Sequence, residues 1–147
     1  MITCSKTYYN IPFAHRQPLH EGHCQYVHGH NWAIKFTFIA KERDENGFVL
    51  DFGKLKFIKE WIDKNLDHAL LICENDSHLE YFKAHASILW KLHILPDASC
   101  EGLCKYIEEQ FRRPVTFESN GRVAIKSVEV FEDDKNSAKY EVGVEWI

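Results

Sequence analysis

The chain has 147 residues, of which 45% are hydrophobic and 27% charged, and its formal net charge is −4. This length is that of one ordinary domain, so we expect a single domain over residues 1–147. The composition is that of a folded, water-soluble protein. The small negative charge argues against nucleic acid as the main partner, because phosphate binding needs a concentrated basic surface.

Nothing in the sequence predicts secretion or a membrane span. The first residues, MITCSKTYYN, lack the basic start and apolar run of a leader peptide. No apolar run approaches the roughly 20 residues that a membrane helix needs. The five cysteines show no paired spacing. We therefore expect reduced thiols in a cytoplasmic protein with no membrane partner.

Two strands are predicted near the start of the chain. In residues 7–15 one strand phase carries Tyr9, Ile11, Phe13 and His15. Pro12 predicts that this strand is an edge strand or carries a bulge. Residues 16–29 form a polar loop, and a second strand follows from a clear alternation of apolar residues, Trp32, Ile34, Phe36 and Phe38. Residues 41–47 read as a charged turn.

Two helices are predicted in the middle of the chain. The first covers residues 54–66, where apolar residues recur at helical spacing, Leu55, Ile58, Ile62 and Leu66. The second covers Cys100 to Arg112, with Ser99 as its N-cap and Pro114 beyond its end. Residues 67–98 fit only short helical or extended pieces between these helices.

Two further strands are predicted at the end of the chain. The first spans residues 123–132 and changes phase, which indicates a bulge near Ser127. The second spans residues 139–146, with Tyr140, Val142, Val144 and Trp146 in one phase. The order of two strands, two helices and two strands predicts an α+β fold, an antiparallel sheet with the helices on one face.

The segment EGHCQYVHGHNW, residues 21–32, is the strongest candidate site. His28 and His30 point to the same side if they start a strand, and His15 lies opposite them if the first two strands pair. Three imidazoles with one open position are typical of a catalytic Zn²⁺. The alternative is chance, because the chain has nine histidines. The spacing fits no structural zinc finger.

Three further positions are candidates for proton transfer. Cys24 lies four residues before His28, where a nearby cation would favour its thiolate as a base. Asp67 directly precedes His68 in an apolar setting, and a carboxylate can fix the tautomer of an imidazole. The ordinary alternatives are an idle thiol and a surface Asp-His pair.

Glu132 continues the phase of Val128 and Val130, so a carboxylate stands where an apolar side chain is expected. Such a carboxylate could bind paired N–H groups of a ligand. The alternative is that the strand ends at Phe131 and a solvated acidic turn follows. The remaining cysteines and histidines are expected to be structural or exposed: Cys4, Cys73, Cys100, Cys104, His20, His23, His78, His85 and His93.

Taken in order, PFAHR, C-x3-HGH, GFVLDFGKLK, LDH, the S-x-E of Ser99 to Glu101 and VEVFED make up a pattern that covers essentially the whole chain. It resembles the 6-pyruvoyltetrahydropterin synthase / 6-carboxytetrahydropterin synthase family, and most closely its bacterial 6-carboxy-5,6,7,8-tetrahydropterin synthase branch. The resemblance implies a tunnelling fold, with a four-stranded antiparallel sheet and two helices on one face. Subunits would join into a barrel, as trimers or hexamers, with active sites at their interfaces.

The resemblance also implies roles for particular residues. The zinc ligands would be His15, His28 and His30, and the catalytic residues Cys24, Asp67 and His68. Glu132, Ser99 and Glu101 would contact the pterin. The substrate would be 7,8-dihydroneopterin triphosphate, and the products 6-carboxy-5,6,7,8-tetrahydropterin, acetaldehyde and triphosphate, on the route to queuosine.

Three alternatives remain open within this resemblance. The pyruvoyl branch eliminates triphosphate without carbon–carbon cleavage, although the three residues between Cys24 and His28 favour the carboxy branch. Another branch uses a glutamate in place of the cysteine, and Glu21 is nearby. A non-catalytic homologue could keep the fold and bind a pterin or purine. One departure from the family pattern is Gly102, where an asparagine is usual.

Overall fold

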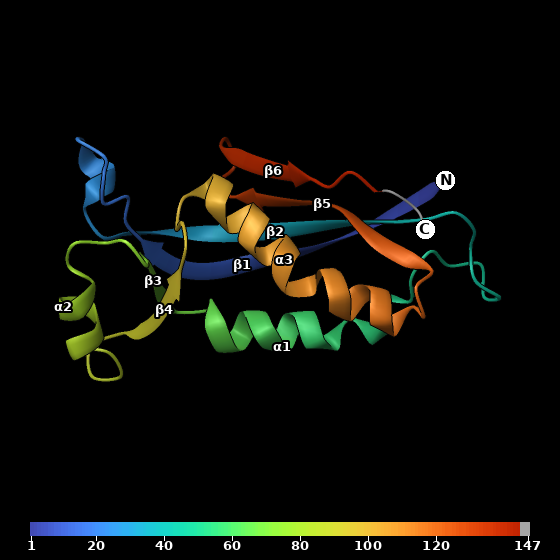
Figure 1. Ribbon diagram of the computed structural model, residues 1–147, viewed down its shortest axis with the longest axis horizontal. Helices are drawn as coiled ribbons and strands as arrows, with labels where there is room; N and C mark the ends of the chain where they lie inside the picture. Colours follow the sequence, from blue (N-terminus) through green and yellow to red (C-terminus); the bar gives the residue numbers. More distant parts are fainter. Residues whose placement is uncertain (145–147) are drawn as a thin grey trace.

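The structure is a computed structural model, and it describes residues 1–144 of the chain. Its centre is a curled six-stranded sheet in the order β4-β3-β1-β2-β5-β6 (Figure 1). The strands are β1 (Ile2–His15), β2 (His28–Ala40), β3 (Ala69–Cys73), β4 (Lys91–Leu95), β5 (Val123–Phe131) and β6 (Ser137–Glu141). The helices are α1 (Lys56–Asn65), α2 (Leu79–Ala84) and α3 (Cys100–Glu118). None of the helices in residues 1–144 is long and apolar enough to cross a membrane.

Strands β1 and β2 form a long antiparallel hairpin that carries the core. The predicted alternation in β2 is confirmed, because Trp32, Ile34, Phe36 and Phe38 are all fully buried. The bulge expected in the first strand is also present, between Tyr8 and Ile11. It lies at Asn10, whose φ is +57°. The bulge reverses the phase, so Tyr8 is buried and the expectation for Tyr9, which is 70% exposed, is wrong.

Helix α3 runs obliquely across the sheet toward α1 (Figure 1), and the two helices meet through Trp61 and Phe111. The first helix is confirmed but begins at Lys56, two residues later than predicted, after a 3-10 turn at Phe52–Lys54. The prediction that the second helix ends before Pro114 is wrong, because α3 continues to Glu118. Pro114 lies on the exposed side of the helix, where water can meet the carbonyl group that proline leaves without a donor. The buried stripe also continues past it, at Val115.

Residues 67–98 contain more regular structure than the sequence indicated. β3 pairs in parallel with the end of β1, at Ala14 and His15, and β4 pairs in parallel with β3. The sheet therefore has six strands of mixed direction, and the expected four-stranded antiparallel sheet is wrong in this detail. All five residues of β3 are buried. A short apolar run of this kind has no helical or strand periodicity to read.

Strand β5 pairs with β2 and with β6. The bulge predicted near Ser127 is confirmed, since the register with β2 shifts between the pairs Thr37–Ser127 and Phe38–Ile125. β6 ends at Glu141, earlier than predicted, so Val142 and Val144 follow the strand. Trp146 lies outside the described residues.

Candidate metal and pterin site

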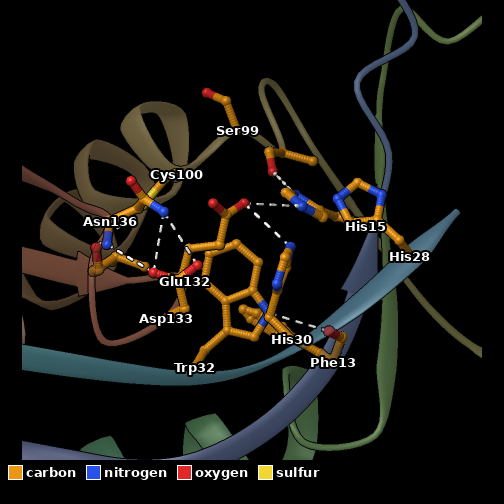
Figure 2. Close-up of polar contacts among 12 residues, drawn as sticks. Phe13, His15, His28, His30, Trp32, Ser99, Cys100, Glu132, Asp133 and Asn136 are labelled. Carbon is orange, nitrogen blue, oxygen red and sulfur yellow. Dashed lines mark hydrogen bonds and ion pairs between the residues drawn. The ribbon is translucent and has the colours of Figure 1, made fainter. Parts of the chain in front are cut away.

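Three histidine rings meet at the end of the β1–β2 hairpin where the connecting loop begins (Figure 2). His15 pairs with His28 across the two strands, and Phe13 pairs with His30. Strand geometry places alternate residues on one face, so the three rings share that face with Trp32. Their centroids are 4.6 Å apart for His15–His28, 5.0 Å for His28–His30 and 5.5 Å for His15–His30. The convergence expected from strand spacing is therefore present.

Backbone carbonyl groups fix the orientation of two of these rings. His15 Nδ1 lies 2.6 Å from the carbonyl oxygen of Ala98, and His28 Nδ1 lies 2.7 Å from that of Tyr26. A carbonyl can only accept a hydrogen bond, so each Nδ1 must carry the proton. The lone pair of each neutral ring is then on Nε2. Metal-binding histidines are commonly held in this way by their second nitrogen.

Glu132 completes the cluster from just beyond β5. Its Oε1 lies 3.2 Å from His30 Nε2 and 3.6 Å from His15 Nε2. These distances are within ion-pair range but the geometry is not that of a hydrogen bond, so both buried Nε2 atoms lack a hydrogen-bond partner. Ligand atoms of His15, His28, His30 and Glu132 all lie within 4.8 Å of one another. Buried, partnerless nitrogens facing a carboxylate are what a bound cation would satisfy.

His15 is suited to remain a neutral ligand. It is buried, with only 2% of its surface exposed. Burial lowers the pKa of His15 below the ordinary value of 6.5, and the nearby His28 and His30 act in the same direction. The hydrogen bond to Ala98 and the charge of Glu132 oppose this shift without reversing it. The free Nε2 therefore keeps its lone pair at neutral pH.

The cluster opens into a cleft of about 580 Å³, which we call the histidine cleft. Its lining includes two cysteines. Cys24 lies on a short 3-10 turn, His23–Gln25, and its carbonyl accepts a 2.7 Å hydrogen bond from the backbone N–H of Gln17. Cys100 donates to the Val130 carbonyl at 3.1 Å, and burial raises its pKa to about 12. Cys100 therefore stays a protonated thiol, which leaves Cys24 as the cleft's candidate base.

The start of α3 forms one wall of the histidine cleft. Ser99 caps the helix as predicted, with its Oγ 2.9 Å from the N–H of Gly102. Glu101 lines the cleft from the first turn of the helix. Gly102 is required here because a Cβ at that position would lie 2.4 Å from Asp97 Cγ. The close approach of Asp97 therefore explains why this chain has a glycine at position 102, where the family usually has an asparagine.

The turn after Glu132 contributes residues that the sequence did not reveal. Lys135, Asn136 and Ser137 line the histidine cleft. The Asp133 carboxylate organises them, because it accepts hydrogen bonds from the backbone N–H groups of Lys135 and Asn136 at 2.8 and 2.7 Å. These hydrogen bonds lower the pKa of Asp133. The strand does end at Phe131, yet Glu132 still points into the cluster (Figure 2).

Asp67 and His68 bond to each other but lie apart from this cleft. His68 Nδ1 is 2.9 Å from Asp67 Oδ1, and the His68 side chain is 79% exposed. His68 lines a separate, open hollow together with Pro12, Ala14 and His30. Within one chain, neither Asp67 nor His68 lines the histidine cleft that contains Cys24.

The sequence is similar to those of tetrahydropterin synthases. The family model described as 6-pyruvoyl tetrahydropterin synthase matches residues 3–142. A 6-carboxy-5,6,7,8-tetrahydropterin synthase of Rickettsia bellii is 31% identical over 137 residues, which cover 90% of this chain and 94% of that relative.

Two solved structures share the fold. An uncharacterized protein of Wolinella succinogenes superposes with a TM-score of 0.80 at 19% identity, over 95% of this chain and 97% of that one. The 6-pyruvoyl tetrahydropterin synthase of Caenorhabditis elegans superposes with a TM-score of 0.67 at 22% identity, over 97% and 96% of the two chains. With the family model matching nearly its whole length, this chain belongs to the 6-pyruvoyl tetrahydropterin synthase family.

Proposed function

We propose that this chain is a zinc-dependent lyase of the 6-carboxy-5,6,7,8-tetrahydropterin synthase type. It would convert 7,8-dihydroneopterin triphosphate to 6-carboxy-5,6,7,8-tetrahydropterin, acetaldehyde and triphosphate, a step toward queuosine. The observation that carries the proposal is that Cys24 lines the same cleft as His15 and His28, two members of the histidine cluster whose rings are held with Nε2 free. The resemblance of the chain to the Rickettsia relative supports the carboxy type.

His15, His28 and His30 are the proposed zinc ligands. Bound zinc would act as a Lewis acid toward the substrate's side-chain oxygens and make the neighbouring protons more acidic. Cys24 would take one of those protons, since the thiolate is the usable base. Cys100 cannot replace it, because its thiol is held protonated.

Glu132 is the proposed anchor of the pterin ring. A carboxylate accepts two parallel N–H groups well, and pterin offers such an edge. Ser99 and Glu101 line the same wall of the cleft. Because Ser99 Oγ already accepts from Gly102, its hydroxyl hydrogen remains to be donated to a ligand oxygen or nitrogen.

Asp67 and His68 require a second copy of the chain if they are to act on the same substrate. Within residues 1–144, two strand edges have backbone groups without a partner strand. The edge of β1 that faces β3 is paired only at Ala14 and His15, and the outer edge of β6 is unpaired because β6 is the last strand of the sheet. Neighbouring copies that pair these edges would form a trimer or hexamer. The relay pair of one copy would then face the histidine cleft of the next.

One incubation tests the proposal. Zinc-loaded protein is mixed with 7,8-dihydroneopterin triphosphate, and the products are identified by mass. The carboxy type predicts 6-carboxytetrahydropterin and acetaldehyde, while the pyruvoyl type predicts triphosphate release without acetaldehyde. Tight pterin binding with no triphosphate release would instead identify a non-catalytic binding protein.

A further inference from the structure

A second cleft lies between the helix α1 and the part of β1 that has no β3 partner on that side. Its volume is about 510 Å³, and we call it the β1–α1 cleft. Residues 6–11 of β1 form one wall, and Phe52, Leu55 and α1 form the other. Asp67, the proposed relay carboxylate, also lines it. The cleft is separate from the histidine cleft within one chain.

Tyr8 gives this cleft a buried polar group that no residue of 1–144 satisfies. Tyr8 is only 7% exposed, and its hydroxyl has no hydrogen-bond partner among the described residues. Burial raises the pKa of Tyr8 to about 12, so the hydroxyl remains a donor. A buried hydroxyl without a partner is unfavourable, and such a group at a cleft wall is suited to a ligand acceptor.

Three lysines, Lys6, Lys56 and Lys59, line the same cleft as Tyr8. Lys6 is half-buried, with its Nζ 5.5 Å from the centroid of the Tyr8 ring and 5.8 Å from that of Phe52. Lys59 is paired with Asp63, and Asp67 is paired with His68. Lys6 and Lys56 make no ion pair with any carboxylate of residues 1–144. Two ammonium groups in the cleft therefore lack a counter-charge.

The histidine cleft has the opposite character. Lys135 is the single lysine or arginine in its described lining, and two carboxylates, Glu101 and Glu132, lie beside it. A triphosphate chain that binds to a protein needs several cations or N–H donors to replace the hydration that its charges lose. The histidine cleft fits the pterin and its reacting side chain better than it fits the phosphates.

We propose that the β1–α1 cleft holds the triphosphate tail of the substrate, with Lys6 and Lys56 as counter-charges and the Tyr8 hydroxyl donating to a phosphate oxygen. This inference rests on the proposed function and extends it to a second cleft. The position of Asp67 is consistent with it, because Asp67 lines this cleft and the phosphates would then lie beside the proposed relay pair. The cleft of one copy would serve the histidine cleft of its neighbour.

Binding of inorganic triphosphate to the zinc-loaded protein tests the proposal without requiring turnover. We expect the double variant Lys6→Met/Lys56→Met to bind triphosphate at least about tenfold more weakly than wild type, and Tyr8→Phe to show a smaller loss. The matched control is Lys64→Met, which removes an exposed lysine of the same helix outside the cleft. Binding of dihydroneopterin, which lacks the phosphates, should be the same in all variants.

Unchanged triphosphate affinity in the double variant, or an equal loss in Lys64→Met, would overturn the inference. Turnover measurements separate it from the proposed function. If wild type turns over dihydroneopterin triphosphate and the double variant does so with an unchanged KM, the subsite is rejected and the function stands. If no variant turns over the substrate while triphosphate binding still depends on Lys6 and Lys56, the function is rejected and the anion site stands.

Discussion

His15 and Ala98 join the metal cluster to the start of α3, because the imidazole Nδ1 donates to the Ala98 carbonyl at 2.6 Å. Ala98 is fully buried and lies in the loop that packs against Gly102. The position of His15 thus depends on a glycine 87 residues away in the sequence. A shift of this loop should therefore change the position of His15 and weaken metal binding.

Gly102→Ala should produce that shift. The added Cβ would lie 2.4 Å from Asp97 Cγ and 2.5 Å from the Asp97 carbonyl oxygen, so the loop must shift. We expect a loss of about 1–3 kcal/mol in the free energy of unfolding. We also expect at least roughly tenfold weaker zinc binding, as for other changes to groups that orient a metal ligand. Urea unfolding and a competitive zinc chelator measure the two effects. Gly143→Ala is the control, because a Cβ there meets nothing within 4 Å.

Removal of one proposed ligand should abolish tight zinc binding while the fold remains. His30→Ala deletes a ring that is partly exposed, so we expect little change in the circular dichroism spectrum of the metal-free protein. Metal analysis after dialysis should give close to one zinc per chain for wild type and almost none for this variant. His78→Ala, a change of an exposed histidine on α2's N-terminus, should keep its zinc. Full zinc retention by His30→Ala would contradict the assigned ligand set.

Cys24→Ala should remove turnover without removing the metal or the fold. The thiol is the proposed base, and a missing general base typically costs about 10²–10⁴-fold in rate. Zinc content and thermal stability should match wild type, because the side chain of Cys24 is not one of the clustered ligand atoms. Cys4→Ala changes a thiol outside the histidine cleft and should retain activity. Comparable turnover in Cys24→Ala and Cys4→Ala would take Cys24 out of the mechanism.

Much of the central fold could be predicted because its patterns are local. The alternation of Trp32 to Phe38 gave the strand and its buried face, and strand parity brought His15, His28 and His30 to one side. The added strands β3 and β4 escaped prediction because a fully buried five-residue run has no periodicity, and parallel pairing joins residues far apart in sequence.

The parts of the two clefts that were missed depend on single backbone features. Asn10 adopts a left-handed conformation that turns Tyr8 inward, and no residue pattern in 7–15 marks that position. His68 has φ of +61°, a left-handed backbone conformation that no pattern in the sequence indicates. Lys135 and Asn136 are placed by hydrogen bonds to Asp133, in a turn that reads as solvated from its composition.

The segment that leads into α2 is held by a buried ion pair whose removal should destabilise the protein. Arg16 Nε lies 2.8 Å from Asp76 Oδ2, and the Asp76 side chain is fully buried. The contact lacks hydrogen-bond geometry, so its contribution is mainly that of charge. Arg16→Met should lower the free energy of unfolding by about 3–5 kcal/mol, because it leaves a buried carboxylate uncompensated. The double variant Arg16→Met/Asp76→Asn should recover part of that loss in urea unfolding. A single variant as stable as wild type would exclude this role.

His93 should make the stability of the metal-free protein fall as the pH is lowered. Its Nε2 lies 2.9 Å from the Tyr106 hydroxyl, and its ring packs against Trp61. Burial, and then the charge of Lys91, lower the pKa of His93 from the ordinary 6.5. The unfolded chain therefore binds more protons than the folded one once the pH drops below about 6.5, and stability decreases from there toward the folded pKa.

His93→Gln should weaken this dependence, because it removes the titrating group while keeping a side chain that can bond Tyr106. We expect a smaller difference in the free energy of unfolding between pH 7.5 and 5.5 than in wild type, measured by urea denaturation with a chelator present. The burial of His15 acts in the same direction, so some dependence should remain. Asp133, whose pKa is lowered from 3.8, titrates below this window. The control is His78→Gln, a change of an exposed histidine, which should keep the wild-type pH dependence. If His93→Gln shows the same pH dependence of the unfolding free energy as wild type, the His93 ring is not its cause.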